Sequence, residues 1–125
     1  MIKVCLVFAS VSGFLSVALG AFGAHGLKGK ISESLLSAFQ TGTHYQMFHT
    51  LALLALAILA MQLESVPKTM AISAYCWMFG VILFSGSLYG LALGGPTWLG
   101  PVTPLGGLLL LSGWAFFCVF VARLA

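Results

Sequence analysis

The chain has 125 residues, of which 61% are hydrophobic and only 6% charged, and its formal net charge is +3. Soluble domains carry about four times this charged fraction, so these few charges cannot cover a water-facing surface. The apolar fraction is also too large for the core of one small soluble domain. The composition therefore excludes an ordinary soluble protein and predicts an integral membrane protein whose solvent and first partner is membrane lipid.

The first predicted element is a membrane-spanning helix over residues 4–24. This stretch has no charged residue, and about 20 apolar residues suffice to cross a hydrocarbon core of about 30 Å. Lys3 before it and the small residues at its end also resemble a cleavable signal peptide. Because the remainder would still be a membrane protein, we expect the segment to be retained as a helix.

A short amphipathic helix is expected next, within ISESLLSAFQ (residues 31–40). The apolar residues of this stretch recur near helical spacing: Ile31, Leu35, Leu36 and Phe39. Ser32 can cap the start of the helix. We expect this helix to lie in the headgroup region and the chain to bend at Gly42 before the second span. The alternative is one long helix that runs from Ser32 through the second span.

Three further apolar runs without Asp, Glu, Lys or Arg follow, over residues 45–63, 70–94 and 105–122. In lipid, only helices and closed barrels satisfy the backbone, and these runs lack the alternation of barrel strands. Thr103 and Pro104 fit the N-cap and the first position of the last helix. The predicted fold class is all-α, with one domain (1–125) that is a bundle of four transmembrane helices and has both termini on one side.

The orientation of the bundle follows from the basic residues at the ends of the spans. Lys3, Lys68 and Arg123 lie on the side of the termini, whereas Lys28 and Lys30 lie on the other side. Because cytoplasmic loops are enriched in Lys and Arg, we expect the termini in the cytoplasm.

Small residues recur every four positions in two of the predicted spans. The first span has Ser12, Ser16, Gly20 and Ala24, and the third span has Gly86, Gly90 and Gly94. In membranes, helices associate by close contact of small residues. We therefore expect the first and third spans to pack through these stripes, either within one chain or between two copies in a homo-oligomer.

His49 lies about one turn inside the second predicted span, near Tyr45 and Gln46 on the helix surface. Burial there favours a neutral ring, which still needs one donor and one acceptor. The expected hydrogen-bond partners are Gln46, Ser85, Ser87 and Tyr89. The simplest interpretation is a hydrogen-bond node inside the bundle. The alternatives are a binding site for a quinone or a lipid headgroup, or an axial haem ligand with His25 as the second ligand.

The sequence lacks the groups that catalysis usually needs. No acid lies in a predicted span, and no nucleophile–base pair, phosphate-binding loop or metal-spaced cluster is visible. The three cysteines have no C-x-x-C spacing and suit apolar packing: Cys5, Cys76 and Cys118. We therefore expect no enzymatic activity, no metal and no cofactor. Because the basic residues form no stripe, we also expect no nucleic-acid partner.

Five motifs, in this order, resemble one known family. They are FGAHGLK (22–28), YQMFHTLALL (45–54), FSGSLYGLAL (84–93), TPLGG (103–107) and GW (113–114). Together they resemble the domain-of-unknown-function family 423, whose members are small bacterial inner-membrane proteins with eukaryotic relatives called transmembrane protein 256. The resemblance covers nearly the whole chain. It implies a four-helix, multi-pass protein of the bacterial inner (plasma) membrane, and it implies no reaction.

The motifs also predict where a site lies. By the topology above, the GAHG and TPLGG motifs and the start of YQMFH lie at one membrane face. We expect any ligand or partner site there, formed by His25, Tyr45, Gln46, His49 and Thr103. The predicted function is a non-enzymatic membrane protein that acts by association, as a homo-oligomer or as an accessory subunit of another membrane protein. The alternative is a binder or carrier of a small lipophilic ligand around His49: a quinone, a lipid headgroup or haem.

Overall fold

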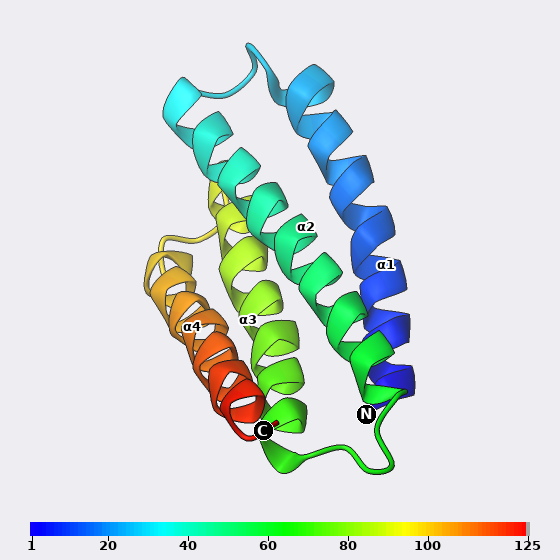
Figure 1. Ribbon diagram of the computed structural model, residues 1–125. Helices are drawn as coiled ribbons and strands as arrows, with labels where there is room; N and C mark the ends of the chain where they lie inside the picture. The colour runs from blue at the N-terminus through cyan, green and yellow to red at the C-terminus, as the bar shows by residue number, and fades with distance from the viewer. Residues whose placement is uncertain (125) are drawn as a thin grey trace.

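The computed structural model describes residues 1–124, and four long helices make up most of this range (Figure 1). They are α1 (Ile2–Ala21), which a short π-helix, η1 (Phe22–Leu27), extends, and then α2 (Glu33–Ala60), α3 (Lys68–Ala92) and α4 (Leu99–Ala122). Each long helix is apolar and long enough to cross a membrane, and residues 1–124 contain no strand. The predicted all-α fold with four transmembrane helices is therefore confirmed.

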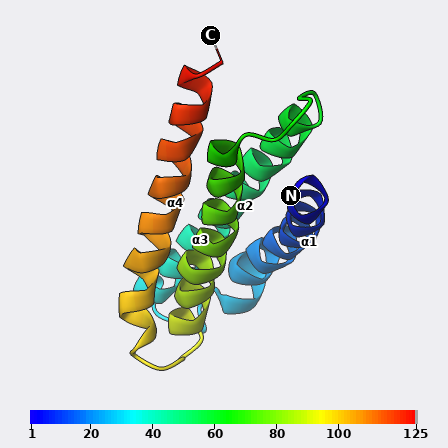
Figure 2. The ribbon, with the colours of Figure 1, turned by 90° about the horizontal axis from the view of Figure 1, so that it is seen from below.

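The four helices form an open bundle in which each helix packs on its neighbours in the sequence (Figure 2). α1 packs on α2, α2 on α3, and α3 on α4. Within residues 1–124, no Cα atom of α2 comes within 8 Å of one of α4, and α1 barely touches α3. Met1 and the end of α4 lie at the same end of the molecule, as four crossings require (Figure 1).

The distribution of polarity is the reverse of that in a soluble protein. Large apolar side chains that are more than half exposed include Phe14, Leu51, Phe79 and Leu111. Buried polar side chains include Ser12, Gln46, His49, Thr50, Ser73 and Ser85. Lipid favours this arrangement, since it solvates apolar side chains and leaves polar groups to pair with one another.

One continuous helix replaces the predicted interfacial helix and second span. α2 begins after Ser32, whose hydroxyl accepts a hydrogen bond from the Leu35 amide (3.2 Å), and it continues to Ala60. The predicted interfacial helix and its bend at Gly42 are therefore wrong, and the alternative long helix is correct. Gly42 stays helical because it is packed against α3, where a Cβ at this position would lie 2.8 Å from the Tyr89 ring.

The predicted start of the last helix is also wrong. α4 begins at Leu99, so Pro104 lies inside the helix, where the carbonyl of Gly100 loses its usual amide partner. Thr103 does not cap the helix, and its hydroxyl instead meets the hydroxyl of Ser87 on α3 at 2.6 Å. This contact with α3 holds the first turns of α4 in place despite the proline.

Gly94 ends α3 instead of continuing the predicted glycine stripe. Its φ of +83° is the left-handed conformation that glycine adopts most easily. The amide of Gly95 donates to the carbonyl of Gly90 at 2.7 Å, and the amide of Gly94 donates to the carbonyl of Leu91 at 3.3 Å. These two bonds form a Schellman motif, which satisfies carbonyls at the end of the helix.

α3 and α4 approach closely because α4 presents glycines to α3. A Cβ at Gly106 would overlap the Phe84 backbone, and a Cβ at Gly113 would overlap the Trp77 indole. The Ser73 hydroxyl also donates to the Gly113 carbonyl at 2.7 Å. Tight glycine contacts therefore join α3 to α4. Gly106 and Gly113 lie outside the predicted stripes, but Gly90 belongs to the stripe of the third span, and a Cβ there would lie 2.6 Å from Leu99.

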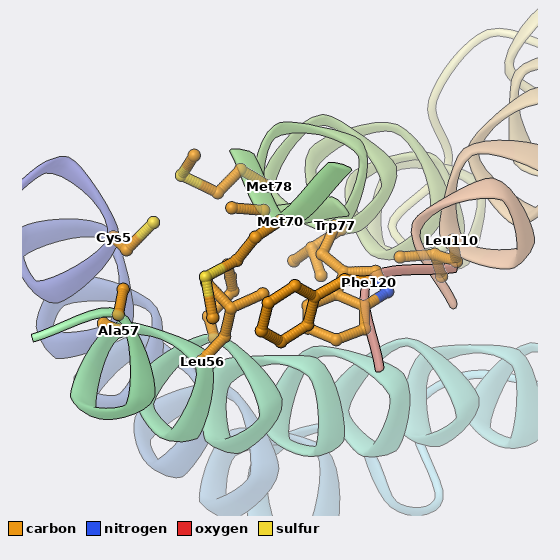
Figure 3. Close-up of a cluster of buried hydrophobic side chains, with 12 residues drawn as sticks. Cys5, Leu56, Ala57, Met70, Trp77, Met78, Leu110 and Phe120 are labelled. Carbon is orange, nitrogen blue, oxygen red and sulfur yellow. The ribbon is translucent and has the colours of Figure 1, made fainter. Parts of the chain in front are cut away.

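A large buried cluster of apolar side chains surrounds Trp77 (Figure 3). Cys5 of α1 and Ala57 of α2 lie at one end of it, where Cys5 acts as the small packing residue that the sequence predicts. Met70 and Trp77 of α3 extend toward Leu56 of α2. The cluster thus joins the helices in the half of the molecule that contains the chain ends.

Replacing Gly106 with alanine is expected to destabilise the protein by about 1–3 kcal/mol, because the new Cβ must displace the Phe84 backbone. Gly107→Ala is the matched control, since a Cβ there meets the Phe84 ring at an ordinary 3.7 Å. Thermal unfolding in detergent, followed by circular dichroism, should show a lower melting temperature for Gly106→Ala only. Equal melting temperatures for the two variants would contradict the close approach of α3 and α4.

Candidate functional site

A network of polar side chains joins the middle of α1 and of α2 to the last turn of α3. The Gln46 amide nitrogen donates to the Ser12 carbonyl at 3.0 Å, and the Gln46 side-chain oxygen accepts from the Tyr89 hydroxyl at 2.5 Å. The Thr50 hydroxyl donates to the Gln46 carbonyl at 2.7 Å and lies 2.7 Å from the Ser12 hydroxyl. These side chains satisfy one another, so the network holds helices together and leaves no free group for a ligand.

His49 joins α2 to α4. Its Nδ1 lies 2.8 Å from the Tyr45 carbonyl, and its Nε2 lies 3.1 Å from Nε1 of Trp114. A carbonyl only accepts a hydrogen bond and an indole N–H only donates one. His49 is therefore a neutral ring that carries its proton on Nδ1 and accepts from Trp114. With 3% of its surface exposed, it is a hydrogen-bond node in the bundle.

The predicted partners of His49 are paired elsewhere. Gln46 and Tyr89 bind each other. The Ser85 hydroxyl donates to the Gly42 carbonyl at 2.7 Å, and Ser87 pairs with Thr103. The true partner, Trp114, belongs to the GW motif, but the sequence alone does not show that this part of α4 faces α2.

Axial ligation of haem by His49 does not fit the structure. The Nε2 lone pair that a metal would need already accepts the Trp114 N–H. The proposed second ligand, His25, lies in η1, before α2 begins. His49 follows Glu33 by sixteen residues, which is about 24 Å along the helix axis. The haem alternative is therefore wrong.

The structure does not gather the five predicted site residues at one membrane face. His25 is exposed in η1, and Thr103 lies in the second turn of α4. Tyr45, Gln46 and His49 lie near the midpoint of α2. The helix that contains Tyr45 begins twelve residues earlier, at Glu33. Binding of a ligand or partner at these residues stays a prediction.

A groove of about 850 Å³ lies between α2 and α4 and is called here the α2–α4 groove. Its walls are mainly aromatic and aliphatic, and they include Phe48, Phe84, Leu108, Leu111 and Trp114. Its polar side chains are His44, Tyr45 and His49. It brings together two of the predicted site residues, Tyr45 and His49, and adds His44 and Trp114, which were not among the predicted site residues. At the Trp114 end, the hydrogen bond to His49 joins the two helices.

The predicted contact between the stripes of the first and third spans does not occur within the chain. A smaller groove of about 290 Å³, the α1–α3 groove, lies there instead, with Ser12, Gln46 and Gly86 in its lining. Ser12 and Ser16 are buried, Ala24 is exposed in η1, and Gly90 is covered by Leu99. A Cβ at Gly20 or Gly86 would have no heavy atom within 4 Å. The stripes stay apart because α1 packs on α2, through polar contacts such as that of Ser12 with Gln46.

Comparison with known proteins gives the same class of molecule. The family model described as "Protein of unknown function (DUF423)" matches residues 19–107. The UPF0382 membrane protein of Haemophilus influenzae is 46% identical over 109 residues, which cover 87% of this chain and 86% of the relative. The UPF0382 inner membrane protein YgdD of Escherichia coli K12 is 47% identical over 119 residues, which cover 95% and 89%. The UPF0382 membrane protein YwdK of Bacillus subtilis is 39% identical over 121 residues, which cover 97% and 98%. No solved structure matches the chain significantly.

Replacing His49 with leucine is expected to destabilise the protein by roughly 1–3 kcal/mol, because the Trp114 N–H loses its acceptor. Trp114→Phe removes the donor, and the double variant leaves neither group unpaired. Chemical unfolding in detergent should therefore show that the double variant loses less stability than the sum of the two single losses. Strict additivity would mean that the two rings do not interact.

Proposed function

The chain belongs to the DUF423 family of membrane proteins of unknown function, and from this premise we propose that it binds a small lipophilic ligand in the α2–α4 groove without catalysing a reaction. The family match confirms the resemblance that the five sequence motifs indicate. The relatives are named membrane proteins, and the Escherichia coli relative is named an inner membrane protein. We infer the same membrane for this chain, with its termini in the cytoplasm as the distribution of basic residues predicts.

The observation that supports ligand binding is the α2–α4 groove itself. Its volume of about 850 Å³ falls within the range of about 300–1,000 Å³ that is usual for small-molecule sites. Like such sites, it combines apolar and aromatic walls with a few polar groups. Because α2 and α4 lie apart, the groove faces the surrounding lipid, from which a lipophilic molecule could enter directly.

The arrangement of groups in the groove favours binding without chemistry. His49 has the side chain best suited to move a proton, but both of its nitrogens are engaged, with Tyr45 and Trp114. Acting as a base would require it to give up the bond that joins α2 to α4. The names of the relatives described above mention no enzymatic activity.

Association between copies is a second candidate role, favoured by small-residue positions that the chain leaves uncovered. Gly20 of α1 and Gly86 of α3 have open space where a side chain would lie. Another helix could approach closely at such positions, which is how many membrane helices associate. The partner would be a second copy of this chain, or a larger membrane protein to which the chain is an accessory subunit.

Filling the α2–α4 groove is expected to abolish ligand binding. Gly107 lines this groove, and a Cβ added at this position would contact only the Phe84 ring. The leucine side chain of Gly107→Leu should therefore extend into the groove. Gly20→Leu is the matched control on α1, where the first carbon of the new side chain has no heavy atom within 4 Å. Native mass spectrometry of protein extracted in mild detergent should show a bound lipophilic molecule in the parent and in Gly20→Leu, but not in Gly107→Leu. A parent without such a molecule, or a Gly107→Leu variant that retains it, would overturn the proposal.

Association is tested by covering the open face of α3. Gly86→Leu should reduce energy transfer between labelled copies in lipid vesicles severalfold, since its side chain occupies the space that a partner helix would need. Gly107→Leu, in the other groove, should leave the transfer unchanged. Absence of transfer in the parent protein would exclude a homo-oligomer and leave only a different membrane-protein partner.

A further inference from the structure

Two polar side chains in the α2–α4 groove have no hydrogen-bond partner among residues 1–124: the Tyr45 hydroxyl and the His44 imidazole. Both side chains are exposed, and 45% of the Tyr45 surface is accessible. The Tyr45 ring packs on Phe84, with their centroids 4.6 Å apart, and stacks near His49. The ring is therefore held by its neighbours while its hydroxyl stays free.

The position of Tyr45 and His44 along α2 makes it unfavourable to leave their polar groups without a hydrogen-bond partner. α2 has 28 residues, about 42 Å at 1.5 Å per residue, and Tyr45 lies about 18 Å from its start. A hydrocarbon core of about 30 Å centred on this helix would begin about 6 Å from that start. With the core placed in this way, Tyr45 and His44 would lie about 10–12 Å inside the hydrocarbon, where lipid tails offer no hydrogen bond.

We propose that the ligand of the α2–α4 groove is a flat ring that bears a carbonyl oxygen, as in a quinone, and that Tyr45 and His44 donate hydrogen bonds to this oxygen. The inference rests on the proposed function and names the chemical class of its ligand. One carbonyl oxygen has two lone pairs and can accept from both side chains. The aromatic side chains of Phe48, Phe84 and Trp114 offer faces and edges for packing against a ring.

Phospholipid is the natural competitor, because its ester groups also contain carbonyl oxygens. Those esters lie at the boundary between headgroups and hydrocarbon, about 10–12 Å above Tyr45 by the same estimate. A lipid in its ordinary position would therefore place only an acyl chain beside the two polar groups. A quinone ring is uncharged and dissolves in the hydrocarbon, so it can reach their level.

His49 lies in the same groove but does not bind this oxygen. Its single N–H is donated to the Tyr45 carbonyl, and its other nitrogen accepts from Trp114. The role of the His49–Trp114 pair is to fix one wall of the groove. The donors to the ligand are therefore the two residues one turn earlier on α2.

Tryptophan fluorescence tests the inference, because quinones quench indole emission. Trp98→Phe removes the exposed indole before α4 and leaves Trp114 in the groove, with the Trp77 ring centred 4.5 Å away. This protein in phosphatidylcholine nanodiscs would be titrated with decylubiquinone. The expected result is saturable quenching. Tyr45→Phe and His44→Leu should each raise the apparent dissociation constant about tenfold, because each removes one hydrogen bond to the ligand. Tyr75→Phe, which alters an exposed tyrosine of α3 outside the groove, should have no effect.

Quenching that rises linearly without saturation would overturn the inference. So would an apparent dissociation constant for decylubiquinone that neither Tyr45→Phe nor His44→Leu changes. A third contrary outcome is that decylbenzene, which lacks the carbonyl, competes with the same affinity. Dibrominated phosphatidylcholine also quenches tryptophan fluorescence. If it quenches the protein and added decylubiquinone does not change this quenching, the occupant of the groove is lipid. In each of these cases, loss of the native ligand in Gly107→Leu would still support the proposed function. The two proposals therefore fail separately.

Discussion

Hydrocarbon offers a protein no hydrogen bonds, and this constraint shapes most of the structure described here. Most buried polar side chains within the spans find a partner on another helix or on their own backbone, and the Trp77 indole N–H is an exception within residues 1–124. Gln46 pairs with α1 and α3, Ser73 with α4, and His49 with Trp114. Because lipid tails compete for apolar side chains, these bonds and the close contacts of glycine give the helices their specific arrangement.

The same constraint distinguishes the two kinds of surface between the helices. Where α3 meets α4, glycines let the backbones approach, and little space remains. Where α2 faces α4, one hydrogen bond from Trp114 spans the gap and a groove stays open beside it. The unpaired Tyr45 hydroxyl and His44 imidazole lie in this open groove, whereas the side chains of the Gln46 network are satisfied. A ligand in the groove could pair with these two groups, whereas the buried indole N–H of Trp77, which also lacks a partner in the described part of the chain, lies outside the groove lining.

The two proposed roles use separate parts of the molecule. The α2–α4 groove and the α1–α3 groove have no lining residue in common. A ligand in the first groove would leave Gly86 free, and a partner helix over the second would leave Tyr45 free. Binding and association are therefore compatible, and α2 and α3, which contribute to both grooves, could link them.

The sequence by itself determined the class of protein and the number of spans, because hydropathy depends only on local composition. It did not determine the packing, since α1 packs on α2 and barely touches α3, the partner that the small-residue stripes predict. It also identified Tyr45 and His49 as polar residues of interest. The tertiary structure decided the helix boundaries, since contacts of Gly42 with Tyr89 and of Thr103 with Ser87 outweigh local turn signals. Only the tertiary structure shows that His49 pairs with Trp114 and that a groove lies beside His44. An apolar pattern shows that a residue lies in lipid or in the bundle, but only the packing of helices distant in sequence shows which side chain it faces.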